Sequence, residues 1–185
     1  MINMRKLSET FAIAAVCGAA LLGASQVWAS GSHGGGHGTS MPIGMPGKAS
    51  EADRTIDIRM LDNYYEPESI SVKAGETVRF KITNAGEFVH EFNIGTRAMH
   101  EDHQKEMMMM MEHGALEPDR INHQMMKMDM GHGKTMEHDD PNSVLLEPGK
   151  TGEVIWKFSE AGNIEFACNV PGHYQAGMMG KVNFK

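Results

Sequence analysis

The residues best suited to chemistry lie in one short stretch near the carboxyl end of the chain. Residues 168–180 are Cys-Asn-Val-Pro-Gly-His-Tyr-Gln-Ala-Gly-Met-Met-Gly, which brings a thiol, an imidazole and a thioether within eleven positions. This mixture favours copper, because one Cys, two His and a weak axial Met form the blue-copper electron-transfer site. Cys168 and His173 are therefore candidate ligands. His90, which follows a predicted strand, is the obvious source of the second imidazole.

Several motifs in the chain resemble the cupredoxin family. Phe166-Ala167-Cys168, Pro171-Gly172-His173 and Gly177-Met178 are similar to its copper loop, and residues 67–80 are similar to its early strands. The resemblance covers residues 54–95 and 143–185. It is greatest to the periplasmic copper-tolerance cupredoxins, which share the Pro-Gly-His-Tyr loop and a His/Met-rich insertion. It implies an all-β Greek-key β-sandwich with one type 1 copper.

The resemblance also bears on the axial ligand and on the surroundings of the site. Met178 and Met179 are both available, and the family spacing Cys-x4-His-x4-Met selects Met178. Asn84 and the backbone around Asn169 are candidates for hydrogen bonds around the ligands. Many cupredoxins carry Asn directly after the first His, whereas this chain has Glu91. That departure leaves the outer hydrogen bonding open.

Short strands must position these ligands. Alternation of apolar and polar residues is the pattern of a half-buried strand, and Gly, Pro and Asn clusters separate such runs here. Strands are predicted at residues 55–60, 70–72, 78–82, 92–95, 144–146, 154–158, 164–167 and 182–184. Short strands with regular turns favour an antiparallel sandwich with a core mainly of Ile, Val and Phe.

Residues 99–138 interrupt the β pattern with eleven Met and six His. Because a long structureless loop is uncommon in a compact domain, we expect helices at about 99–112 and 118–130, with Pro118 in a first helical turn. Thioethers prefer Cu(I), while imidazole also binds Cu(II), so the insertion is a candidate for further copper binding. The alternatives are packing, a partner surface or an oxidation sink. The candidate additional ligands are Met99, His100, His103, Met107, Met111, His113, His123, Met126, Met130, His132 and His138.

The first 29 residues have the pattern of a secretory signal peptide. A basic start precedes an apolar run of signal-peptide length, and Val27-Trp28-Ala29 offers small residues at the cleavage positions. Cys17 raises a lipoprotein alternative, which the bulky Val16 disfavours. We therefore expect a periplasmic protein without stable membrane insertion. Residues 30–53 are predicted to be a flexible Gly/His-rich leader, and residues 54–185 the cupredoxin domain with its insertion.

The net charge and the cysteine content limit the possible partners and favour a bound metal. The formal net charge is -7, and the signal peptide carries one net positive charge, so the exported chain would carry -8. Nucleic acid is therefore not expected as a partner, since a basic face is its usual footprint. With Cys17 removed, Cys168 would be the only thiol, and a lone thiol in an oxidising compartment is a liability unless something such as a metal occupies it.

The sequence therefore predicts a periplasmic copper protein that acts in copper tolerance, with copper ions and a redox protein as partners. It would bind copper and oxidise Cu(I) by one-electron transfer. One alternative is a dedicated electron carrier whose insertion recognises a partner, and another is a copper store. An enzyme is not expected, because the neighbours of Cys168 are Ala167 and Asn169 rather than His, and only one such unit fits in the chain.

Overall fold

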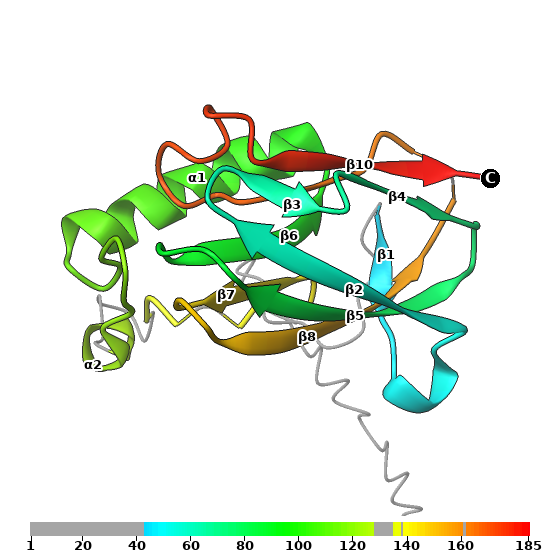
Figure 1. Cartoon of the computed structure of the whole chain (residues 1–185), viewed down its shortest axis with the longest axis horizontal. Coiled ribbons are helices and arrows are strands. Elements are labelled where there is room, and N and C mark those ends of the chain that lie inside the picture. Colours follow the sequence, from blue (N-terminus) through cyan, green and yellow to red (C-terminus); the bar gives the residue numbers. More distant parts are fainter. Residues whose placement is uncertain (1–42, 128–134, 138, 161) are drawn as a thin grey trace, which may run out of the picture. The chain divides into compact units, whose positions relative to one another are not determined.

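The computed structural model describes residues 43–127, 135–137, 139–160 and 162–185. The predicted signal peptide with Cys17, residues 30–42 and the candidate ligands Met130, His132 and His138 lie outside these ranges. Within the described part, ten strands form two five-stranded sheets (Figure 1).

The two sheets confirm the predicted all-β sandwich. The first contains, in spatial order, β1 (Gly44–Pro46), β8 (Thr151–Phe158), β5 (Thr77–Asn84), β2 (Arg54–Leu61) and β3 (Tyr64–Glu66). The second contains β4 (Ser69–Val72), β10 (Met179–Phe184), β9 (Glu165–Ala167), β6 (His90–Gly95) and β7 (Ser143–Leu146). We expected an antiparallel sandwich. Most strand pairs are antiparallel, but β2 pairs with β5 and β4 pairs with β10 in parallel, so the sandwich is mixed.

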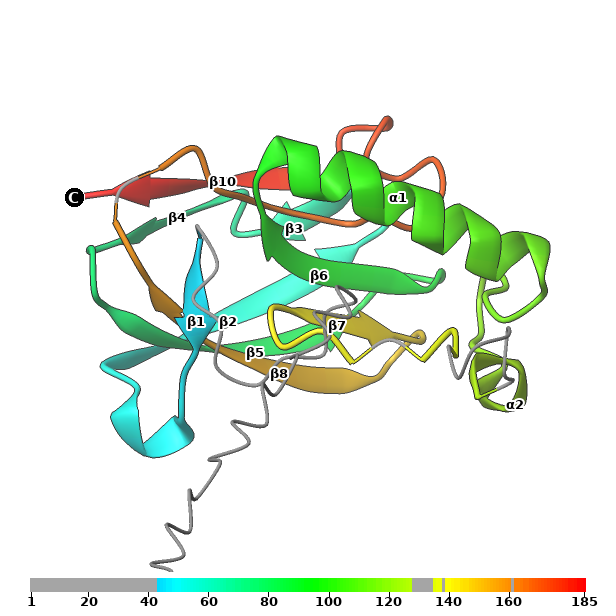
Figure 2. The ribbon, with the colours of Figure 1, turned by 180° about the vertical axis from the view of Figure 1, so that it is seen from behind.

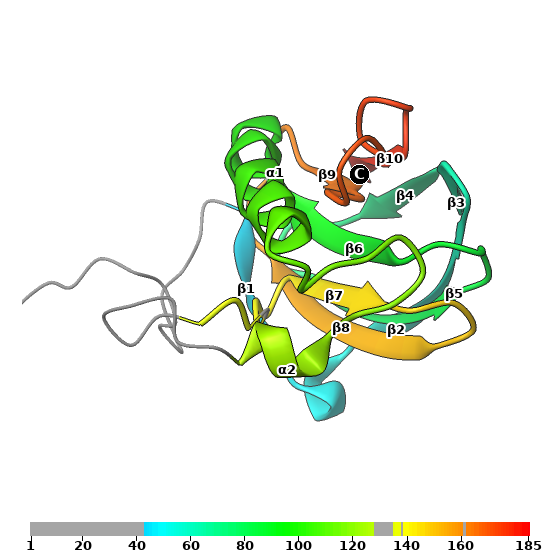
Figure 3. The same cartoon turned by 90° about the vertical axis from the view of Figure 1, so that its left-hand side faces the viewer.

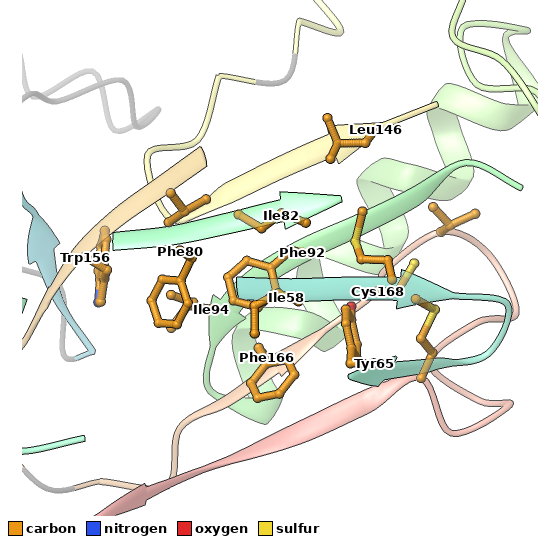
Figure 4. Close-up of a cluster of buried hydrophobic side chains, with 14 of the residues drawn as sticks. Ile58, Tyr65, Phe80, Ile82, Phe92, Ile94, Leu146, Trp156, Phe166 and Cys168 are labelled. Carbon is orange, nitrogen blue, oxygen red and sulfur yellow. The ribbon is translucent and has the colours of Figure 1, made fainter. Parts of the chain in front are cut away.

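The core between the sheets follows the alternation in the strands. Val78, Phe80 and Ile82 of β5 point inward and are buried, as their spacing predicts. The predicted Ile, Val and Phe are joined by Tyr65 and Trp156, which are also fully buried. Figure 4 shows this core extending from Trp156 at one end to Cys168 at the other.

Strand β6 is buried along its whole length, although its sequence alternates between polar and apolar residues. Successive side chains of a strand point to opposite faces, so Phe92 and Ile94 share the core face while Glu91 and Asn93 share the other. Helix α1 (Arg97–Glu112) lies over that second face (Figures 2 and 3). The insertion therefore covers the outer side of the sheet that carries His90.

The domain begins earlier than residue 54, and the prediction of a flexible leader is wrong for residues 43–53. Ile43 is buried, and its carbonyl accepts a hydrogen bond of 3.0 Å from the Trp156 indole. Strand β1 pairs with β8, and a short 3-10 helix follows at Ala49–Glu51. A glycine is required in β1 because a Cβ on Gly44, whose φ is +129°, would lie 2.1 Å from the Lys157 carbonyl oxygen.

The insertion contains one long helix and one short helix. Helix α1 agrees with the first predicted helix and starts two residues earlier, where Thr96 accepts a hydrogen bond from the Met99 amide. The second prediction is largely wrong, since α2 spans only His123–Met126. The Asn122 side chain caps α2, whereas the Pro118 carbonyl accepts a hydrogen bond from Val89 and is held outside any helix.

Among the described residues, we find no helix with the length and apolar character needed to cross a membrane.

Candidate metal centre

Three side chains, from the start of β6 and from the segment between β9 and β10, converge in the structure. His90 begins β6, Cys168 directly follows β9, and His173 lies in the loop between β9 and β10. The His90 and His173 Nδ1 atoms are 3.2 Å apart, and Cys168 Sγ is 3.9 Å from the first and 3.3 Å from the second. An atom at the centre of this triangle would lie about 2 Å from each corner, which is close to a metal–nitrogen bond in proteins. The three atoms therefore fit a single metal ion.

The loop between β9 and β10 is held closed by its own backbone. The Cys168 amide donates to the Met178 carbonyl at 3.1 Å, and the Met178 amide donates to the His173 carbonyl at 3.0 Å. Gly172 and Gly177 have φ values of +91° and +99°, a conformation that side chains rarely allow. The Pro-Gly-His and Gly-Met motifs thus shape a turn that returns Met178 to the side of Cys168.

The two methionines at the end of this loop have opposite surroundings. Met178 is completely buried, whereas the Met179 side chain begins β10 and is 38% exposed. Because an axial thioether must reach into the site, this difference favours Met178, in agreement with the family spacing. Met179 lies at the rim of the site.

The ionisation of the three converging side chains suits metal binding. Burial lowers the pKa of His90, against the hydrogen bond to Asp62, and lowers the pKa of His173 to about 4, so both imidazoles are neutral near pH 7. Burial also raises the pKa of the Cys168 thiol to about 12, against the effect of the Glu91 amide hydrogen bond. Since the thiolate is the ligand form, a metal must displace the thiol proton when it binds.

Asp62 orients His90, and no pattern in the sequence pointed to it. Its Oδ1 lies 2.9 Å from His90 Nε2, so the imidazole donates from Nε2 and presents Nδ1 to Cys168. The same carboxylate accepts a hydrogen bond from the Glu87 amide. Gly86 permits this approach, because a Cβ there would lie 2.3 Å from Asp62 Oδ1 and 2.8 Å from His90 Nε2.

We expect Asp62→Ala to weaken copper binding by roughly 10–100-fold, the usual effect of removing the hydrogen-bond partner of a ligating His. Asp62→Asn should lose less affinity, because an amide oxygen still accepts from His90 Nε2. Competition with a copper chelator measures the affinity, and Asp57→Ala, which removes an exposed aspartate of β2, is the matched control. Equal affinity of Asp62→Ala and the control would show that Asp62 does not position His90.

Glu91, which directly follows His90, forms hydrogen bonds with Cys168 and with Asn169, the next residue along the chain. Its amide donates to Cys168 Sγ at 3.3 Å, and its carboxylate accepts from the Asn169 amide at 3.2 Å and from Asn169 Nδ2 at 2.8 Å. Asn84 instead donates to the carbonyls of Phe88 and Leu146, which fixes the approach to His90. Glu91, which stands where many cupredoxins carry Asn, therefore links strand β6 to the loop that begins with Cys168.

In the described part of the chain, only His90, Cys168 and His173 converge as a set of three or more His, Cys, Asp or Glu side chains, and no His of the insertion belongs to such a set. The candidate ligands of the insertion fall into three groups according to their exposure. Buried are His100, Met107 and Met126; partly buried are Met99, His103 and Met111; exposed are His113 and His123. Their role in binding copper stays a prediction.

A two-sheet sandwich with this His, Cys and His centre at one end of its core defines a cupredoxin. A cupredoxin-like domain family matches residues 20–102, and the solved structures agree on the fold. Auracyanin from Roseiflexus castenholzii is 21% identical, with a TM-score of 0.51 over 72% of this chain and 98% of that one. Auracyanin B is 18% identical, with a TM-score of 0.54 over 79% and 96%. These likenesses show the cupredoxin fold.

Curated relatives narrow the assignment. The copper-resistant cuproprotein CopI of Pseudomonas aeruginosa is 51% identical over 150 residues, which cover 76% of this chain and 81% of that protein. The protein of the same name from Rubrivivax gelatinosus is 40% identical over 147 residues, covering 79% and 75%. The chain belongs to the CopI family of cupredoxins.

Proposed function

We propose that this protein acts in copper resistance by binding copper at one type 1 site, where it oxidises Cu(I). The observation that carries the proposal is the convergence of two imidazole Nδ1 atoms and one thiol sulfur within 3.9 Å, with His90 and Cys168 fully buried and His173 partly buried. The names of the curated relatives, which are copper-resistant cuproproteins, support the physiological role.

His90, Cys168 and His173 would be the equatorial ligands of this site, and Met178 its axial ligand. Bound copper would supply a one-electron couple between Cu(II) and Cu(I). One Cu(I) ion would thus give one electron to the site, leave as Cu(II), and the electron would pass to an acceptor protein. The chain holds the ligands in place through Asp62 and Glu91, so the site need not rearrange when its charge changes.

We propose further that the insertion captures excess copper through its solvent-facing side chains. His113 and His123 are exposed, as are the thioethers of Met108 and Met109. His123 also lines a pocket with Met126 and the carboxylates of Glu137, Asp139 and Asp140. Such a mixture of soft and hard donors can hold copper in either oxidation state.

The signal-peptide pattern of residues 1–29 supports a periplasmic location, where a copper-resistance protein meets incoming metal. The absence of His beside Cys168 supports a role without multicopper catalysis, since Ala167 and Asn169 offer no ligand for further copper. The protein would therefore bind copper and exchange electrons rather than act as an oxidase.

A dedicated electron carrier is the second candidate, and one observation favours it. The Phe88 ring is 44% exposed and lies edge-on to the His173 ring, with 6.5 Å between their centroids. Met179 is also exposed at the rim of the same loop. An apolar rim around an imidazole of the site suits docking of a redox partner, and the net charge of -7 favours a basic one.

An anaerobic titration with Cu(II), read by visible absorption and by total bound metal, distinguishes the two candidates. For copper resistance, we expect an intense sulfur-to-copper band that saturates at one equivalent, followed by further colourless binding. Replacing Met108 and Met109 with Leu and His113 and His123 with Gln should remove the colourless binding, leave the band and lower the copper tolerance of cells. Saturation at one equivalent with nothing more bound would support the electron carrier, and the absence of any band would refute the site.

A further inference from the structure

Glu91 is completely buried between β6 and α1, where a lone carboxylate would be costly. Its Oε1 accepts hydrogen bonds from Ser143 Oγ at 2.6 Å, His103 Nε2 at 2.9 Å and Asn93 Nδ2 at 3.3 Å. Its Oε2 accepts both bonds from Asn169. A single carboxylate therefore ties together β6, β7, helix α1 of the insertion and the loop that begins with Cys168.

The contact from α1 is a charged one. His103 Nε2 faces Glu91 Oε1, and His103 Nδ1 lies 3.0 Å from Glu106 Oε2. Carboxylate oxygens accept hydrogen bonds, so both ring nitrogens must donate, which requires the imidazolium form. An imidazolium has no free lone pair for a metal. His103 is thus placed to hold Glu91 rather than to bind copper.

Two more residues on the same face of α1 contact the copper loop. His100 Nδ1 lies 3.2 Å from Asn169 Nδ2, and Gln104 Oε1 accepts a 2.7 Å hydrogen bond from Gln175 Nε2. Residues three and four apart share one face of a helix, so His100, His103 and Gln104 form a continuous contact surface. Figures 2 and 3 both place α1 beside the loop between β9 and β10.

We infer that α1 of the Met/His-rich insertion is a positioning element of the copper centre, acting through the buried bridge from His103 to Glu91 to Asn169. The inference rests on the proposed copper site. It states in addition that the properties of this site depend on the insertion. Asn169 directly follows Cys168, and the Glu91 amide donates to the Cys168 sulfur. Hydrogen bonds around the thiolate sulfur tune a type 1 site, so displacement of the bridge alters its spectrum and potential.

The inference assigns different roles to the two sides of α1. The side with His100, His103 and Gln104 positions the copper loop, and the exposed Met109 on the opposite side of the helix can contact copper or a partner. A ligand that moves or unfolds α1 would therefore change the electron-transfer properties of the buried centre. Copper that binds to the insertion and moves α1 would thus alter the spectrum and the potential of the redox site.

The test compares His103→Gln, Glu91→Gln and the double variant with the control Lys105→Gln, which removes an exposed cation from the same helix. For each copper-loaded protein, the sulfur-to-copper band and the reduction potential are measured, together with affinity by chelator competition. Both single variants should shift the band and the potential, and affinity should fall by roughly 10-fold or more. The double variant should differ from the sum of the singles, because the two residues share one interaction. The control should match wild type.

An amide hydrogen-exchange measurement on the wild-type protein keeps the inference testable even if the variants do not fold. One equivalent of Cu(I) should slow exchange in α1 around residues 100–107, and in Cys168→Ser it should not. Wild-type spectra and potentials in the folded variants, or exchange in α1 that ignores copper, would overturn the inference. If wild type itself showed no sulfur-to-copper band, the proposed copper site would fail instead.

Discussion

Replacing Cys168 with Ser is expected to abolish the intense visible band and to cost more copper affinity than the roughly 10–100-fold of an outer hydrogen-bond change. The sulfur is the only thiol among the described residues, and it faces both imidazoles at 3.3–3.9 Å. A hydroxyl is a harder and much less acidic donor, so it cannot replace a thiolate as a ligand of a soft metal. The titration and chelator competition described above measure both effects.

Met179→Leu is the matched control for this substitution, because it changes an exposed sulfur side chain at the end of the same loop. It should keep the band and the affinity, whereas Met178→Leu should keep the band and shift the reduction potential. In cells, Cys168→Ser should fail to restore copper tolerance, although colourless binding by the insertion persists. A Cys168→Ser protein with wild-type colour would contradict the assignment of this cysteine.

The parts of the fold that were predictable are those whose residues alternate within one segment. Strands β5 and β8 are long enough for their pattern to identify a buried face. The three-residue strands β1 and β3 carry no such pattern, and their pairing depends on partners that the local sequence does not specify. Tyr65 of β3, whose hydroxyl donates to the Glu91 carbonyl, was missed for this reason.

The ligands that lie close together in the sequence were predictable. Cys168, His173 and Met178 share one loop, and the structure brings His90 to the first two. Asp62 was not predictable, because it lies 28 residues before the His90 side chain that it orients and follows an ordinary strand. The position of α1 was not predictable either, because Glu91 and Asn93 alternate with Phe92 and Ile94 and so indicate a solvent-facing side of the strand, whereas the structure buries both.

Residue types alone do not assign a role to the side chains of the insertion. His100, His103 and Met107 are among the candidate copper ligands, and each also contacts the rest of the domain. A helix rich in Met and His has the same composition whether its side chains bind a metal or pack against the adjacent sheet. Only the position of the buried Glu91 carboxylate separates these possibilities for His103.

His103 should make the stability of the copper-free protein depend on pH. Burial lowers the pKa of His103, but the Glu91 carboxylate, together with Glu106 and Asp140, raises it more, to about 9 from an ordinary 6.5. The folded chain therefore holds the proton more tightly than the unfolded chain. The stabilisation is fully present below about pH 6.5 and is lost as the pH rises through about 9, and it amounts to about 3 kcal/mol.

Urea unfolding of wild type and His103→Gln between pH 6 and pH 10 measures this effect. We expect the free energies of unfolding to differ by about 3 kcal/mol at the low end and to converge at the high end, where wild-type His103 is also neutral. Cys168 ionises more readily in the unfolded chain and also lowers stability at high pH, but it does so in both proteins, so the difference between them isolates His103. A difference that stays constant across this range would show that the Glu91–His103 contact does not depend on the imidazolium charge.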